Sequence, residues 1–142
     1  MRQIQSLIEQ KQKEWQVDFV GLAENVAPTH APKEIHWLYV AGNQSIAYKN
    51  IRLQVGRGIA GLVWKTARSQ KDKHILADVE KRLEYPIART EKLVNVYAVP
   101  VMDKHEVIGV LLIGYRSAID VFDEQKIEKF ALELSSLILR NE

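Results

Sequence analysis

The stretch Val-Gly-Arg-Gly-Ile-Ala-Gly-Leu-Val-Trp-Lys-Thr, residues 55–66, sets three glycines between an expected strand and an expected short helix. Its pattern Gly56-x-Gly58-x-x-Gly61 fits the dinucleotide-binding fingerprint, and Asp78 stands about 20 residues after the second glycine, where the fingerprint has an acidic residue. That fingerprint requires a parallel sheet of successive βαβ units, whereas the strands around this stretch are expected to form antiparallel hairpins. We therefore reject a dinucleotide site.

The three glycines have a local interpretation instead. Gly56 and Gly58 allow the chain to turn sharply out of the strand, and Gly61 allows a helix to pack closely on the sheet, because none of them has a Cβ. The backbone amides near Ile59, Ala60 and Gly61 then lie at the start of a helix, where unpaired N–H groups favour an anion.

N-terminal to this stretch, the pattern predicts a helix within residues 1–26 and then a hairpin. Apolar residues recur at helical spacing among Gln, Lys and Glu, namely Ile4, Leu7, Ile8, Trp15, Phe19 and Leu22. The prolines at 28 and 32 end this helix. Residues 35–40 and 47–55 are rich in β-branched and aromatic residues and flank a short polar turn, which predicts a hairpin.

C-terminal to it, the expected elements are a strand at 73–76, a brief helix from Asp78 to before Pro86, a loop at 85–92, strands at 93–102 and 106–116, and a helix at 122–140. Asp78 and Asp123 are the expected N-caps. The nearly continuous apolar run 106–116 predicts the central strand. The chain is thus expected to be a single α+β domain over residues 1–142, with sheet and pocket within 35–117 and the end helices together on one face of an antiparallel sheet.

Composition removes several classes of function. The 142 residues include no cysteine, so disulfides, Cys-ligated zinc, iron–sulfur clusters and thiol nucleophiles are excluded. Lys and Arg number 20 against 18 Asp and Glu, without a run of like charge, so a nucleic-acid interface is not expected. The longest apolar stretch, 107–115, is too short to span a membrane, and the N-terminus is polar, so we expect a soluble, cytoplasmic protein.

Taken together, residues 55–66, the stretch 75–79, the hairpin 97–112 and the helix start Phe122-Asp123-Glu124 resemble a GAF domain over residues 35–140. The resemblance implies a central antiparallel sheet, end helices on one face, and a small-molecule pocket under short helices and loops on the other. The absence of cysteine excludes the sulfoxide reductases of this fold and the carriers of cysteine-linked pigments. The signature of the cyclic-nucleotide binders is also absent, since Lys49-Asn50 is in reversed order and Phe122-Asp123-Glu124 is contiguous.

Within the GAF domains, the chain is similar to the stand-alone nitrate-sensing proteins of staphylococci and related Gram-positive bacteria. The resemblance implies a pocket for nitrate, bound without covalent linkage and without a cofactor, and a partner that is a cytoplasmic sensor histidine kinase governing nitrate respiration. The residues matching that family's pocket, with the adjoining glycine, are Trp37, Ile59, Ala60, Gly61, Tyr85, Pro86 and Ile87.

Alternatives stay open at this point. A GAF domain that dimerises or acts as a scaffold through its end helices fits the same sequence, as does a receptor for another small ligand. On base rates Trp37 on a strand is more often a core aromatic than a ligand wall, and Tyr85-Pro86 is an ordinary helix terminator. No catalytic set and no metal-ligand spacing is apparent, so neither an enzyme nor a metal site is expected. Four basic residues near the loop, Arg57, Arg82, Arg89 and Lys92, are offset in sequence by Glu80, Glu84 and Glu91.

Overall fold

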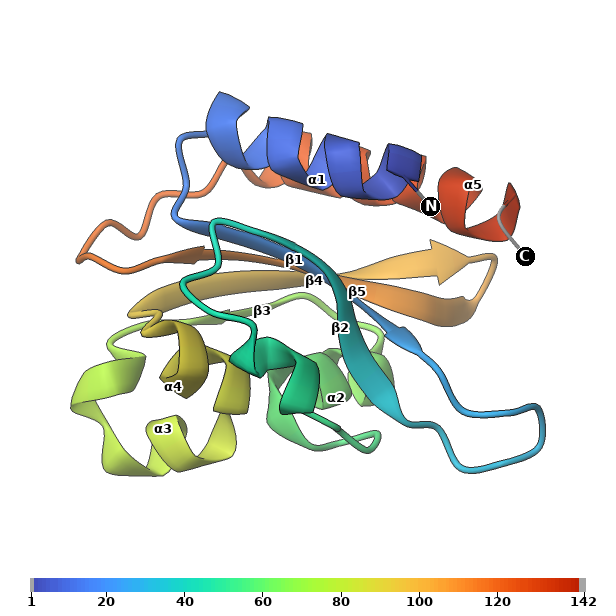
Figure 1. Cartoon of the computed structure of the whole chain (residues 1–142), viewed down its shortest axis with the longest axis horizontal. Helices are drawn as coiled ribbons and strands as arrows, with labels where there is room; N and C mark the ends of the chain where they lie inside the picture. The colour runs from blue at the N-terminus through green and yellow to red at the C-terminus, as the bar shows by residue number, and fades with distance from the viewer. Residues whose placement is uncertain (1, 141–142) are drawn as a thin grey trace.

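A computed structural model describes residues 2–140, and this part of the chain forms one antiparallel sheet of five strands between two layers of helices (Figure 1). The strands are β1 (Phe19–Asn25), β2 (Ile35–Ala41), β3 (Gln70–Asp72), β4 (Asn95–Asp103) and β5 (Glu106–Tyr115), in the spatial order β2-β1-β5-β4-β3. The helices are α1 (Arg2–Glu14), α2 (Gly58–Thr66), α3 (Val79–Glu84), α4 (Pro86–Glu91) and α5 (Glu124–Arg140), with 3₁₀ turns η1 (Ala47–Asn50) and η2 (Ile75–Ala77). The expected α+β class is confirmed. No helix of the described chain is both long and apolar enough to cross a membrane.

The N-terminal helix is shorter than the sequence predicts. The helix expected within residues 1–26 ends at Glu14, Gln16 adopts a left-handed φ of 53°, and Phe19–Asn25 is a strand. Strand β1 lies between β2 and β5, so both of its edges are paired, and the helical layers cover both of its faces; its first five residues are all buried. The spacing of Phe19 and Leu22 also fits one face of a helix, which is why the sequence predicted a helix here. In the strand their side chains point to opposite sides of the sheet.

The expected hairpin of 35–40 with 47–55 is also wrong. Strand β2 pairs with β1, from Val20 opposite Ala41 to Asn25 opposite Ile35. Residues 47–50 form η1, and the following segment meets β2 only through the Ile35–Leu53 bridge. Since β2 takes its main partner from a segment predicted to be helical, the pairing was not visible from the local pattern.

The C-terminal half agrees better with the prediction. Strands β4 and β5 form the expected hairpin, and β5 occupies the middle of the sheet. The Asp78 carboxylate accepts from the amides of Glu80 and Lys81 at 3.0 and 3.2 Å, and Asp123 accepts from the Lys126 amide at 3.2 Å, so both N-caps are confirmed. Two details are wrong: the strand expected at 73–76 lies at β3, and the expected loop 85–92 contains helix α4.

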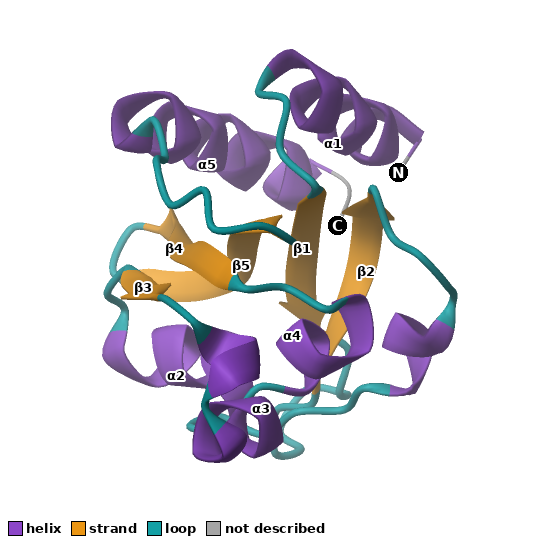
Figure 2. Ribbon diagram, turned by 90° about the vertical axis from the view of Figure 1, so that its left-hand side faces the viewer, coloured by secondary structure: helices purple, strands orange, loops and turns teal. Residues whose placement is uncertain are grey.

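The two helical layers enclose two separate apolar clusters. Helices α1 and α5 lie together over one face of the sheet, as expected, and the short helices α2, α3 and α4 cover the other (Figures 1 and 2). The end-helix side contains Ile8, Leu134 and Ile138, whereas the short-helix side contains Trp37, Ile59 and Ile87. Because the sheet is buried on both faces, each layer is closed off from the other.

The glycine-rich stretch makes a compact loop before α2. Gly56 and Gly58 have φ values of +92° and +65°, which confirms that they permit the turn. A Cβ on Gly61 would lie 2.4 Å from the carbonyl oxygen of Gln54, and Gly61 accepts a 2.7 Å hydrogen bond from the Gly56 amide. Gly61 thus brings α2 against its own preceding loop, rather than against the sheet as expected.

Replacing Gly61 by Ala should lower the free energy of unfolding by about 2 kcal/mol, because the added methyl group meets a backbone oxygen that has no room to move. Urea denaturation followed by circular dichroism measures this loss. Thr66→Ala, at the exposed end of the same helix, is the matched control and should cost well under half as much. Equal stability of Gly61→Ala and wild type would contradict the close approach.

Candidate anion-binding site

Strand β2 places Trp37 in the short-helix layer. The side chain is 3% exposed, and its ring lies over Gly21 of β1, where a Cβ would come within 3.1 Å of Trp37 Cε3 and 2.9 Å of Phe19 Cε2. The indole Nε1 is buried and has no hydrogen-bond partner. A buried N–H without an acceptor costs free energy, so this donor is available to a ligand.

The first turn of α2 supplies further unpaired donors. The N-cap Arg57 makes no side-chain cap, and no hydrogen bond within the described chain reaches the amides of Gly58, Ile59 or Ala60. Ile59 and Ala60 are 2% and 0% exposed. Gly61 is the fourth residue of the helix. Its carbonyl accepts from the Gly56 amide at 2.7 Å, and a Cβ there would lie 2.4 Å from the Gln54 carbonyl oxygen, so the absence of a side chain is what this position requires.

The Tyr85-Pro86-Ile87 segment forms the start of α4. Pro86 is the first helical residue and has no N–H, and Tyr85 makes no side-chain cap. Within the described chain the Ile87 amide has no acceptor, and the residue is 1% exposed. The loop expected here from the sequence is wrong, although a proline at a first helical position is a known signal of a helix start.

The Tyr85 hydroxyl interacts with Asp72, which is not a member of the cluster that holds these donors. Burial, with a hydrogen bond to Asp72 and the negative charges of Asp72 and Glu84, raises the pKa of Tyr85 well above its ordinary value. The Asp72 carboxylate also pairs with Lys81 at 2.6 Å. Tyr85 therefore offers the layer its ring and stays protonated across the physiological range.

The structure brings most of the predicted site residues together. Trp37, Ile59, Ala60, Tyr85 and Ile87 belong to a single buried cluster of apolar residues. Pro86 is half-buried and lines a groove on the outer side of the layer. The donors available inside are neutral N–H groups. The arrangement therefore suits a weakly basic anion of low charge rather than a strongly basic, highly charged one.

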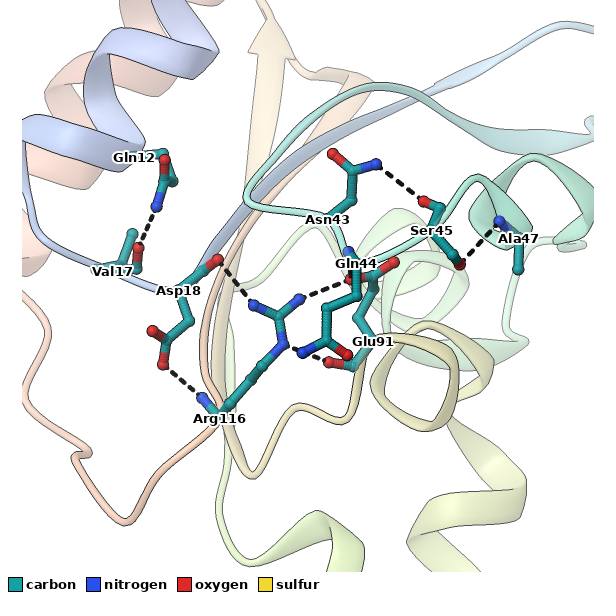
Figure 3. Close-up of polar contacts among 9 residues, drawn as sticks. All are labelled: Gln12, Val17, Asp18, Asn43, Gln44, Ser45, Ala47, Glu91 and Arg116. Carbon is teal, nitrogen blue, oxygen red and sulfur yellow. Dashed lines mark hydrogen bonds and ion pairs between the residues drawn. The ribbon is translucent and has the colours of Figure 1, made fainter.

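An ion-pair network, not predicted from the sequence, fixes the far end of α4 (Figure 3). Arg116, which follows β5, donates to the Glu91 carboxylate at 2.6 Å, to the Glu91 carbonyl at 2.8 Å and to the Asp18 carbonyl at 3.2 Å. The Gln44 amide donates to the same Glu91 oxygen at 2.8 Å. Glu91 is fully buried, so helix α4 is tied both to the sheet and to the turn after β2.

Comparison with known proteins identifies the fold. Neither a family model nor a curated protein matches the chain. Among solved structures, the GAF domain of an Acinetobacter phosphoenolpyruvate-protein phosphotransferase superposes with a TM-score of 0.75 at 17% identity, over 96% of this chain and 79% of that one. The fold is that of a GAF domain.

Two Staphylococcus aureus structures are more similar in sequence. One is the hypothetical protein SA1058, with 35% identity, a TM-score of 0.78, and coverage of 84% of this chain and 97% of that one. The other is an NreA protein mutated in its nitrate binding site, with 33% identity, a TM-score of 0.81, and coverage of 90% and 98%. The chain belongs to the NreA family of GAF proteins.

Substituting Arg116 with Gln should destabilise the fold by about 3 kcal/mol, because the buried Glu91 carboxylate loses its charged partner. Lys126→Gln is the control, since its pair with Asp123 spans 3.8 Å between side chains that are 67% and 54% exposed, and its loss should cost less than about 0.5 kcal/mol. Chemical denaturation of both variants gives the comparison. Similar losses of unfolding free energy in the two variants would show that the network does not stabilise α4.

Proposed function

We propose that this protein is a non-catalytic cytoplasmic sensor that binds nitrate between β2, α2 and α4 and thereby modulates a sensor histidine kinase of nitrate respiration. The observation that carries the proposal is the Trp37 indole N–H, buried without an acceptor in the cluster that also holds Ile59, Ala60 and Ile87. The backbone amides of these three residues likewise lack acceptors within the described chain.

The chemistry of the cluster fits nitrate. Nitrate is planar, carries one delocalised negative charge and has no proton to donate, so it requires donors only. The unpaired amides at the start of α2 provide donors and a partial positive charge, and the apolar surroundings exclude water and strengthen each hydrogen bond. A buried Lys or Arg would instead favour phosphate or a carboxylate through stronger charge pairing.

The relatives support the same ligand. The NreA protein of Staphylococcus aureus is described as having a nitrate binding site, and this chain covers 98% of that structure's length at 33% identity. We therefore assign the predicted residues Trp37, Ile59, Ala60, Gly61, Tyr85, Pro86 and Ile87 to the nitrate pocket, with Trp37, Ile59, Ala60 and Ile87 as donors and the rest as walls.

Signalling requires that the kinase bind the nitrate-loaded and nitrate-free forms unequally. Helix α4 is suited to carry that difference, because its first turn holds a candidate donor and its last residue, Glu91, is bonded to Arg116 and to the Gln44 amide. A change at the pocket therefore reaches the turn after β2 through direct bonds.

Association through the end helices is a second candidate role, favoured by one observation. Leu132 and Leu139 lie two turns apart on α5 and are 71% and 43% exposed. A homodimer or scaffold contact on this face is compatible with nitrate binding in the opposite layer.

Nitrate should raise the melting temperature of the purified protein in a saturable manner, because a ligand that binds only the folded state stabilises it. Thermal unfolding is measured in nitrate, chloride and sulfate at equal ionic strength. If nitrate stabilises no more than chloride, the assigned ligand is wrong.

Trp37→Phe should weaken nitrate binding by about tenfold or more, because it removes one hydrogen bond to a charged ligand while keeping an aromatic ring. Isothermal titration gives the affinities. Trp15→Phe is a closely matched control: its indole N–H is also buried and unpartnered, but it lies in the opposite layer against Phe130. Equal losses in the two variants, or none in Trp37→Phe, would remove Trp37 from the site.

Nitrate and the kinase should affect each other's affinity by the same factor, as linkage requires. The kinase is titrated with and without saturating nitrate, and nitrate is titrated with and without the kinase. If nitrate leaves the affinity for the kinase unchanged, the regulatory part of the proposal fails while nitrate binding stands.

A further inference from the structure

A basic groove of about 440 Å³ runs along the outer side of the short-helix layer, between η1 with the segment that follows it and α4. Its lining residues are Ala47, Asn50, Ile51, Arg52, Leu53, Pro86, Arg89 and Thr90. None of them is acidic. The groove is therefore positively charged, and it lies next to the helix that begins at Pro86.

The groove and the predicted nitrate pocket share a thin wall. Ile51 and Leu53 line the groove and are also members of the buried cluster that contains the unpaired donors. A Cβ on Gly58, the first residue of α2, would lie 3.0 Å from Leu53 Cδ2. Pro86 lines the groove, and the next residue, Ile87, has the unpaired amide. One layer of side chains thus separates the groove from the donors.

The two arginines of the groove keep their charge unpaired. Arg52 and Arg89 are exposed, and neither forms an ion pair within the described chain. Glu91, which offsets Arg89 in the sequence, is fully buried and bonded to Arg116 instead. Glu84 lies on α3 and does not line the groove.

We infer that this groove is an outer anion site and the entry route to the nitrate pocket, an inference that rests on the proposed function. Arg52 and Arg89 attract the anion from solution, and the anion then passes between the 51–53 segment and the start of α4 to the neutral donors inside. Attraction by two guanidinium groups does not select among anions, so selection for nitrate occurs at the inner donors. Separating the two functions lets the inner site hold a weakly basic anion without a charged side chain.

Two consequences distinguish an entry route from a surface patch. Association of nitrate should slow when the arginines are neutralised, most clearly at low ionic strength, where exposed charges are least screened. Sulfate should slow nitrate association with the wild-type protein by occupying the outer site, without filling the inner pocket. In a protein lacking both arginines, sulfate should slow nitrate association no more than chloride does at equal ionic strength.

The test is stopped-flow tryptophan fluorescence on the double variant Arg52→Gln/Arg89→Gln. Its nitrate association rate at low salt should fall about tenfold and approach the wild-type rate in high salt. Arg68→Gln/Arg140→Gln is the control, since it removes the same charge from exposed positions that do not line the groove, and its rate should stay within about twofold of wild type.

Wild-type association kinetics in Arg52→Gln/Arg89→Gln, with nitrate still bound, would overturn the entry route and leave the proposed function standing. An equal slowing in the control would also overturn it, because net charge rather than the groove would then set the rate. A wild-type protein that binds no nitrate would overturn the proposed function itself and the entry route with it.

Discussion

A buried N–H group either has an acceptor or lowers the stability of the fold by remaining unpaired. This constraint decides what the short-helix layer can bind. The sheet seals that layer from the end helices, so the donors of Trp37, Ile59, Ala60 and Ile87 have no access to polar groups on the other side. Because the surrounding cluster is made of apolar residues, we proposed a small anion of low basicity as the ligand of these donors. Arg57, at the N-cap of α2, makes no side-chain cap, which leaves the first amides of the helix available, and Gly61 packs the helix against the preceding loop.

The charged groups near the cluster are either paired or exposed to solvent. The buried carboxylate of Glu91 is neutralised by Arg116 and held by the Gln44 amide, so it places no negative charge in the way of an incoming anion. Arg52 and Arg89 remain on the surface, where their hydration is retained. In the proposed arrangement, charged groups therefore act at the rim and in the supporting network, whereas the proposed inner site relies on neutral donors.

How much of this could be predicted depends on the range of each interaction. Asp78, Asp123 and the β4–β5 hairpin act over a few residues, and the sequence predicted them correctly. Phe19 and Leu22 fit a helical spacing as well as a strand, and only the insertion of β1 between β2 and β5 decides between the two. The site residues were named by resemblance to a family. Only the three-dimensional arrangement shows which of their N–H groups lack acceptors. It alone also shows that Glu91 is paired with Arg116, 25 residues further along the chain.

A nitrate titration of ¹⁵N-labelled protein followed by NMR shows directly whether the four donors bind the anion. The Trp37 indole resonance and the amide resonances of Ile59, Ala60 and Ile87 should shift along one common saturation curve, because each donor gains an acceptor, while the Trp15 indole resonance stays in place. Shifts confined to residues outside the short-helix layer, or none at these four donors at saturation, would contradict binding by these donors.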